Sequence, residues 1–146
     1  MIHVTGRVLL SLIFILSGLA KVSNWTATAD YMTGSGMPFV AFFLAAAIVV
    51  EVGAGLALLF GVQTKTAAQI LAAYLIPVTL IFHAFWSLDG MDRQMQLINF
   101  LKNLAILGGL LALSSASAKA VISVPTGKIQ GPGLKTVGQD REKRSA

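Results

Sequence analysis

Long apolar stretches occupy most of the first 120 residues, and polar residues gather between them. Four of these stretches are long enough for a helix to cross the hydrocarbon core of a bilayer, which is roughly 30 Å thick. The predicted spans are 4–22, 39–62, 66–86 and 95–117. The alternating pattern of a membrane β-barrel is not seen. The sequence therefore predicts an all-α membrane protein, a four-transmembrane-helix bundle over residues 1–120.

The amino-acid composition is also typical of a membrane protein. Of the 146 residues, 55% are hydrophobic and only 12% are charged, about half of the ~25% that is usual in soluble proteins. The chain has no cysteine, which excludes disulfides and iron–sulfur ligation by this chain alone. The sequence also shows no ligand cluster for a metal. The net charge of +5 is concentrated near the ends of the spans and in the tail, where lipid headgroups rather than nucleic acid account for it.

The basic residues predict the orientation of the chain. An even number of spans places both termini on one face, and most basic residues belong to that face: Arg7, Lys65, Lys119, Lys128, Lys135, Arg141, Lys143 and Arg144. The opposite face has two basic residues, Lys21 and Arg93, and three acidic residues, Asp30, Asp89 and Asp92. Because basic residues are enriched in cytoplasmic loops, we predict that both termini are cytoplasmic.

The sequence also allows predictions for the first connection, for the C-terminal tail and for the first span. The connection 23–36 is long enough for a short interfacial helix around Trp25, Tyr31 and Met32. Residues 121–146 form a polar, basic tail, predicted to be disordered or bound to the membrane surface. The first span also has features of a signal peptide, because Arg7 precedes an apolar stretch that ends in small residues. We favour a span over a cleaved peptide.

Glu51 is the most informative polar residue, because it lies near the middle of the second span. A charge at a helix centre costs ~2.5–3.5 kcal/mol on insertion scales, so Glu51 needs a partner or a proton. Lys102 lies at a similar depth in the fourth span, within about one helical turn. We therefore predict an ion pair between Glu51 and Lys102. The pair would either fix the helix register or serve proton or ligand chemistry.

Other polar residues extend this candidate site. Asn99, Lys102 and Asn103 share one helix face, which should point into the bundle. Asparagine amides bind either a neighbouring helix or the carbonyl oxygens of a quinone-like ring. His83, near the outer end of the third span, is either a hydrogen-bonded interfacial residue or a proton carrier. The candidate quinone or proton site, expected between the second, third and fourth spans, comprises Glu51, His83, Asn99, Lys102 and Asn103.

A series of short motifs lies between residues 14 and 109. They are FILSGLAK at 14–21, GMP at 36–38, Glu51, Gly61 with Thr64-Lys65, FHAF at 82–85 and LKNLAILGG at 101–109. In this order and spacing they resemble the DoxX family of small membrane proteins, over about residues 7–113. The resemblance implies a multi-pass protein of the bacterial inner membrane. It also implies relatives associated with quinone-linked oxidoreductases or with oxidative-stress and detoxification systems.

The sequence is compatible with two classes of function. In the first, the protein is a membrane subunit that supplies a quinone pocket, while another subunit carries the redox centre that this chain lacks. In the second, it is a non-catalytic scaffold or accessory subunit. Its partners are then the lipid bilayer and either other membrane protein subunits or a second copy of itself. Transport is a weaker third class, since four helices form only a small pathway. Quinone is the one cofactor that the first class requires.

Overall fold

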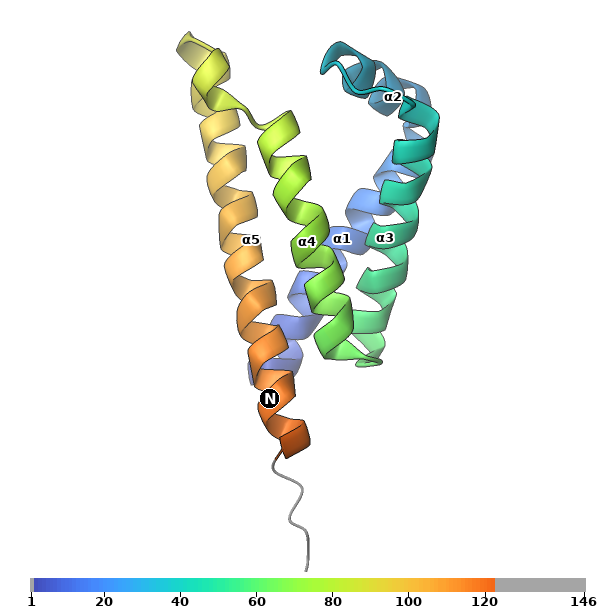
Figure 1. The fold of residues 1–146 in the computed structure, drawn as a ribbon, viewed down its shortest axis with the longest axis vertical. Helices are drawn as coiled ribbons and strands as arrows, with labels where there is room; N and C mark the ends of the chain where they lie inside the picture. The colour runs from blue at the N-terminus through green and yellow to red at the C-terminus, as the bar shows by residue number, and fades with distance from the viewer. Residues whose placement is uncertain (1, 123–146) are drawn as a thin grey trace, which may run out of the picture.

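The computed structural model describes the backbone of residues 2–122 and the side chains of residues 4–116. Its elements are α1 (Ile2–Ser23), α2 (Trp25–Gly34), α3 (Val40–Phe60), α4 (Thr64–Phe82), the short 3-10 helix η1 (Phe85–Ser87) and α5 (Gly90–Ile122). The described part of the chain contains no strand, so the all-α prediction is confirmed (Figure 1). The tail predicted from residue 121 onwards falls almost entirely outside the described residues.

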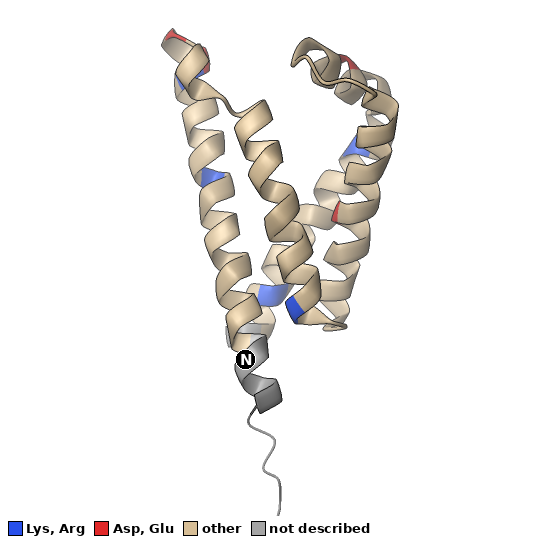
Figure 2. Ribbon diagram, in the orientation of Figure 1, with Lys and Arg blue, Asp and Glu red and all other residues tan. Residues whose placement is uncertain are grey.

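Four helical segments are long and apolar enough to cross a membrane. They are Val4–Ser23, Val40–Phe60, Thr64–Ser87 and Gly90–Ala116. Few charged residues interrupt them (Figure 2). The beginning of α1 and the last turns of α5 lie at one end of the molecule, here called the closed end. The short helices α2 and η1 lie at the opposite end, here called the α2 end (Figure 1). A helix is thus present in the connection where the sequence predicts one.

The long helices pack as two pairs, α1 with α3 and α4 with α5. Contacts between α3 and α4 and between α1 and α5 join the pairs, whereas α3 and α5 do not touch within the described residues. The pairs lie close together at the closed end and diverge toward the α2 end (Figure 1). The buried core belongs to the converging part and includes Phe14, Leu58, Leu71 and Leu110. In the diverging part, a cavity lined by residues of α3 and α4 is left outside the core.

The turn between α3 and α4 fixes the closed end. Gly61 takes the left-handed conformation at φ 73°, and its N–H donates to the carbonyl of Leu58 at 3.1 Å. The next N–H, of Val62, donates to the carbonyl of Ala57 at 2.9 Å, so two helix-end carbonyls are satisfied. The guanidinium of Arg7 lies directly against Gly61. A cation is favourable at this position because a helix C-terminus carries partial negative charge.

Candidate functional site

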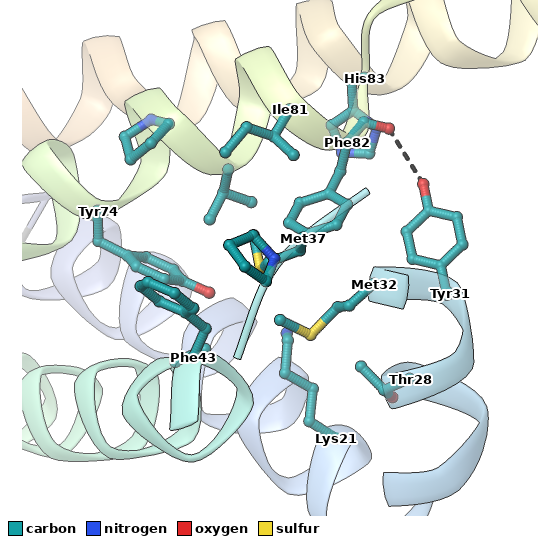
Figure 3. Close-up of a pocket in the computed structure, with 14 residues that line it drawn as sticks. Lys21, Thr28, Tyr31, Met32, Met37, Phe43, Tyr74, Ile81, Phe82 and His83 are labelled. Atoms are coloured by element: carbon teal, nitrogen blue, oxygen red, sulfur yellow. Dashed lines mark hydrogen bonds between the residues drawn. The ribbon is translucent and has the colours of Figure 1, made fainter. Parts of the chain in front are cut away.

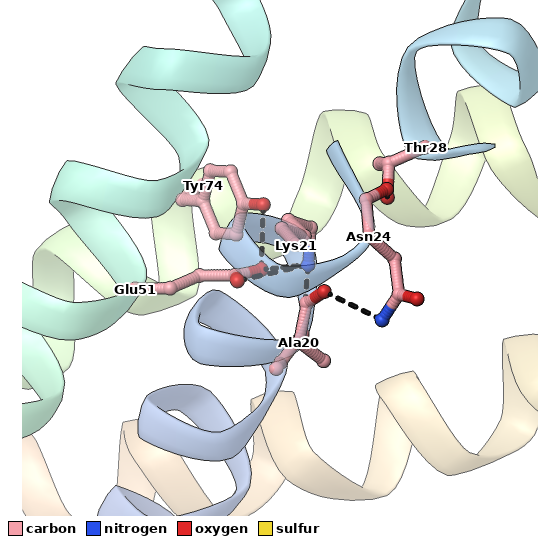
Figure 4. A network of polar contacts seen from close by, with 7 residues as sticks. Ala20, Lys21, Asn24, Thr28, Glu51 and Tyr74 are labelled. Carbon is pink, nitrogen blue, oxygen red and sulfur yellow. Dashed lines mark hydrogen bonds and ion pairs between the residues drawn. The ribbon is translucent and has the colours of Figure 1, made fainter. Parts of the chain in front are cut away.

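A cluster of polar side chains lies inside the bundle where α1, α3 and α4 meet. Lys21 Nζ lies 2.8 Å from Glu51 Oε2 and 2.9 Å from Oε1, and it also donates to Ser17 Oγ at 2.7 Å. Tyr74 donates its hydroxyl to Glu51 Oε1 at 2.7 Å (Figure 4). The side chain of Glu51 is only 5% exposed and that of Lys21 is 23% exposed. The carboxylate therefore has both an opposite charge and a hydroxyl donor.

Close helix packing brings this cluster together. Ser17 and Lys21 are one turn apart on α1, so both face α3. Gly18 lies between them, and a Cβ at this position would come within 2.6 Å of Val52 Cγ2 and 3.3 Å of Glu51 Cβ. The missing side chain of Gly18 lets the backbone of α1 approach α3 at the level of Glu51. The lysine can then reach the carboxylate without leaving its own helix face.

The predicted ion pair between Glu51 and Lys102 is wrong. Glu51 pairs with Lys21, and Lys102 is exposed on α5, a helix that does not touch α3. The physical reason is that a count of residues estimates depth along each helix but does not say which helices are neighbours. Lys21, at the end of the first span, was expected to face the membrane surface. It turns inward because Glu51 lies opposite it.

A large cavity lies next to this cluster, in the space where the helix pairs diverge. Its volume is about 480 Å³, and residues of α2, α3 and α4 form most of its walls, with the end of α1. The lining is mainly apolar, and the side chains that matter most for its chemistry are Lys21, Tyr31, Met32, Phe43, Tyr74 and His83 (Figure 3). A cavity of this size is typical of sites for small organic ligands. Glu51 itself lies behind Lys21 and Tyr74 and does not line it.

Aromatic and polar contacts close the cavity toward the α2 end. Tyr31 donates its hydroxyl to the backbone carbonyl of Phe82 at 3.1 Å, and the two rings stack with centroids 5.6 Å apart. Both residues also line a second cleft of about 470 Å³ that includes Asp92 and Gln96. His83 lines the large cavity, and its Nδ1 hydrogen-bonds Gln96 Oε1 at 2.7 Å. A polar contact thus links the cleft to the cavity.

The remaining predicted site residues lie elsewhere. Asn103 Nδ2 donates to Thr79 Oγ1 at 3.0 Å, which joins α5 to α4 next to a small pocket of about 130 Å³. Asn99 is half-buried on α5 and lines neither the large cavity nor the cleft. The five predicted residues therefore do not form one site. Of these five residues, only His83 lines the large cavity. Glu51 lies behind Lys21 and Tyr74, which do line it.

Sequence reasoning missed the roles of Lys21, Tyr31 and Tyr74. The spacing of Ser17 and Lys21 on one face of the first span was a usable signal, because it places a hydroxyl next to a lysine within an apolar helix. The tyrosines carry no such signal, since an isolated tyrosine in an apolar stretch is common at membrane interfaces. Within the described residues, no group of three or more His, Cys, Asp or Glu side chains could hold a metal ion.

Comparison with known proteins places this geometry in a family. The profile of the DoxX family matches residues 2–84. The chain belongs to the DoxX family. It is 36% identical to Inner membrane protein YqjF of Escherichia coli (strain K12) over 109 residues, which cover 75% of this chain and 78% of that relative. It is 30% identical to Inner membrane protein YphA of the same organism over 116 residues, which cover 80% and 83%. No solved structure matches the chain at a significant level.

The DoxX match confirms the predicted resemblance and the predicted location. With four candidate transmembrane helices and relatives named as inner membrane proteins, this DoxX protein is a multi-pass protein of the bacterial inner membrane. The DoxX profile covers every residue that lines the large cavity, together with Ser17 and Glu51. The polar cluster and the cavity thus belong to the DoxX part of the chain, and α5 follows it.

Proposed function

We propose that this protein is a membrane subunit that binds a quinone-type ring in the large cavity and serves an oxidoreductase whose redox centre lies in another subunit. The observation that carries the proposal is the cavity of about 480 Å³ between α2, α3 and α4. Its lining is mainly apolar, and it has polar groups at two separate places. Lys21 and Tyr74 lie next to the buried carboxylate, and His83 lies toward the α2 end.

The two polar places suit the two carbonyl oxygens of a quinone ring. At one, Lys21 lines the cavity, and we expect one of the three N–H groups of its ammonium to turn from Ser17 to a carbonyl oxygen of the ring. Tyr74 continues to donate its hydroxyl to Glu51. At the other, Nδ1 of His83 faces the side-chain oxygen of Gln96, which favours the tautomer with the proton on Nδ1. Nε2 then has the lone pair, so it accepts a hydrogen bond from the hydroxyl of the reduced ring, and after taking up a proton it donates to a carbonyl oxygen of the oxidised ring.

Reduction of a quinone to a quinol takes up two electrons and two protons. In this proposal the electrons come from the partner subunit that carries the redox centre. For the protons, Gln96 lines the cleft at the α2 end and contacts His83, which lines the cavity. Gln96 thus holds the imidazole of His83 at the boundary between the cleft and the cavity, where His83 can exchange protons with water from the cleft. His83 is the residue we expect to pass protons at the ring, as a general acid or base.

Filling the cavity tests the proposal. The full-length protein, purified in mild detergent with any subunits that co-purify, is titrated with a short-chain benzoquinone by calorimetry. Ala47 lines the cavity, so Ala47→Leu should weaken binding by about tenfold, equivalent to about 1.4 kcal/mol. Ala45→Leu is the matched control, because Ala45 is exposed on the same helix, and it should leave the affinity unchanged. His83→Ala should also weaken binding.

Two outcomes would contradict the proposal. Saturable binding that Ala47→Leu and His83→Ala leave unchanged would place the ligand outside the cavity. No binding by the intact assembly would favour the second class of function, a non-catalytic scaffold or accessory subunit.

A further inference from the structure

Lys102 is a charged residue without a partner in the described part of the chain. It is exposed on α5 within the segment Gly90–Ala116, which is apolar enough to span the membrane. The ion pair of the described residues joins Lys21 to Glu51 and leaves Lys102 out. None of the described hydrogen bonds involves its ammonium group. A lysine in this position faces hydrocarbon unless another molecule covers it.

The depth of Lys102 makes this exposure costly. Nine residues separate it from Arg93, the nearest charged residue toward the α2 end, which is a rise of about 14 Å. Toward the closed end, Ala116 is about 21 Å away by the same rise. A lysine side chain reaches water from near a helix end, but its stem covers only part of either distance. The ammonium group therefore needs an anionic partner within the membrane.

The surface around Lys102 has the character of a helix-packing face. We name it the open face of α5, made up of the exposed residues Ile98, Leu101, Lys102, Ala105, Gly108 and Ala112. Only 11% of the fourth span is buried, compared with 28% of the third. A Cβ added at Gly108 would meet nothing within 4 Å. Small residues such as Ala105 and Gly108 allow another helix to approach closely within a membrane.

We propose that the open face of α5 binds a transmembrane helix of a different membrane protein, and that this helix carries an aspartate or glutamate that pairs with Lys102. Charge complementarity selects the partner, because a lysine ammonium in hydrocarbon is stabilised by a carboxylate at the same depth. The partner is thus a protein whose membrane span contains an acidic residue. The proposal does not depend on what the large cavity binds.

A second copy of this chain does not meet the requirement. Glu51 is the only acidic residue inside the four spans apart from Asp92, which lies in the first turn of α5. Glu51 is buried and already paired with Lys21. A symmetric dimer through the open face would also bring two Lys102 side chains toward each other, because such an interface uses the same surface twice. Like charges would then meet at the depth where a charge is most costly.

Site-specific crosslinking in the native membrane tests the proposal. A photoreactive benzophenone amino acid is placed at Ala105 in the full-length protein, and at Leu16, which is exposed on α1, as a control position. We expect a crosslinked product from Ala105 that contains a protein with an acidic residue in a membrane span. Lys102→Met should lower the yield of this product by about tenfold, whereas Lys102→Arg should retain it. Lys102→Glu combined with a lysine at the partner's acidic position should restore it.

Several results would overturn the proposal. These are no product at Ala105, a product that is a dimer of this chain, a partner without an intramembrane acidic residue, or a yield that Lys102→Met does not change. A separate measurement excludes an internal role: Lys102→Met should not lower the stability of the isolated protein in detergent, and a clear loss would contradict the proposal. Quinone binding by Lys102→Met protein should match the wild type, so this proposal and the cavity proposal fail independently.

Discussion

The contact between Lys21 and Glu51 places two opposite charges inside an apolar bundle. Removing charges from water is costly, and a buried ion pair compensates for this only when its geometry is good and its other polar atoms are satisfied. Here Ser17 accepts from the ammonium group and Tyr74 donates to the carboxylate. Residues of α1, α3 and α4 therefore depend on one another for their hydrogen bonds. The cluster fixes the positions of these three helices as well as one end of the cavity.

A double-mutant cycle tests this interdependence. Glu51→Gln and Lys21→Met should each lower the free energy of unfolding by about 3 kcal/mol, because each leaves an uncompensated polar or charged group inside. The double variant should lose less than the sum of the two by about 1 kcal/mol or more, since directly interacting residues are non-additive. The measurement is unfolding of the full chain in mild detergent. Additive losses would show that the two side chains do not interact.

The need of Glu51 for a partner was predictable from the sequence, but the identity of the partner was not. The cost of a charge depends on its depth, which a count of residues along one span estimates. The partner depends on which helices pack together, and this is decided by three-dimensional contacts such as that of Gly18 with Val52. Lys102 was at a suitable depth but on a helix that does not touch α3.

At the level of elements, α1 and α3 have the most extensive contact of any helix pair within the described residues. Two glycines allow it, Gly18 on α1 and Gly55 on α3. A Cβ added at Gly55 would lie 2.9 Å from Ile15 Cγ1 and 3.4 Å from the backbone oxygen of Ser11. In a membrane, apolar burial from water does not hold two helices together, so close van der Waals contact of this kind is a main source of their affinity.

Two glycines of α3 provide a matched test of this packing. Gly55→Ala should lower the free energy of unfolding by about 1–3 kcal/mol, the usual cost of overpacking. Gly53→Ala should leave it unchanged or raise it by up to about 1 kcal/mol, because a Cβ there meets nothing within 4 Å and alanine is the better helix former. Both variants are compared by unfolding in the same detergent. Equal effects at the two positions would contradict a close α1–α3 contact.

The helices themselves could be predicted from the sequence, whereas their arrangement could not. Length and hydropathy are local properties, and they identified four long helices and the short helix α2. The pairing of α1 with α3 and of α4 with α5 depends on the shapes of the helix surfaces. The large cavity follows from this pairing, because it lies where the two pairs diverge (Figure 1). Its walls therefore include α2 and exclude α5, contrary to the expected site between the second, third and fourth spans.

For the whole molecule, the cavity lies toward the α2 end, opposite the beginning of α1 and the last turns of α5 (Figure 1). The polar cluster, the cavity and the cleft follow one another toward the α2 end, while Arg7 and the turn at Gly61 belong to the closed end. The orientation of the protein in the membrane therefore decides which aqueous compartment the cleft faces. If the closed end is cytoplasmic, protons that reach His83 from the cleft next to Gln96 come from the periplasmic side.

The distribution of charge predicts this orientation more strongly once the fold is known. Lys21 is part of an internal ion pair, so it no longer counts as a loop charge at the α2 end. The loops of that end then have one basic residue, Arg93, and three acidic residues, Asp30, Asp89 and Asp92. The sequence assigns the other loop and tail cations to the opposite face, namely Arg7, Lys65 and the basic residues beyond Ala116. Because lysine and arginine concentrate in cytoplasmic loops, we expect both termini in the cytoplasm.

Reporter fusions test this orientation. Green fluorescent protein at residue 1 or residue 146 should be fluorescent, and alkaline phosphatase at residue 146 should be inactive, because it folds to its active form only outside the cytoplasm. Alkaline phosphatase inserted after Ser35, in the connection that follows α2, should be active and serves as the control for the opposite face. An active phosphatase at residue 146 would contradict the predicted orientation. The cleft next to Gln96 would then open to the cytoplasm, and the proposed proton route would start there.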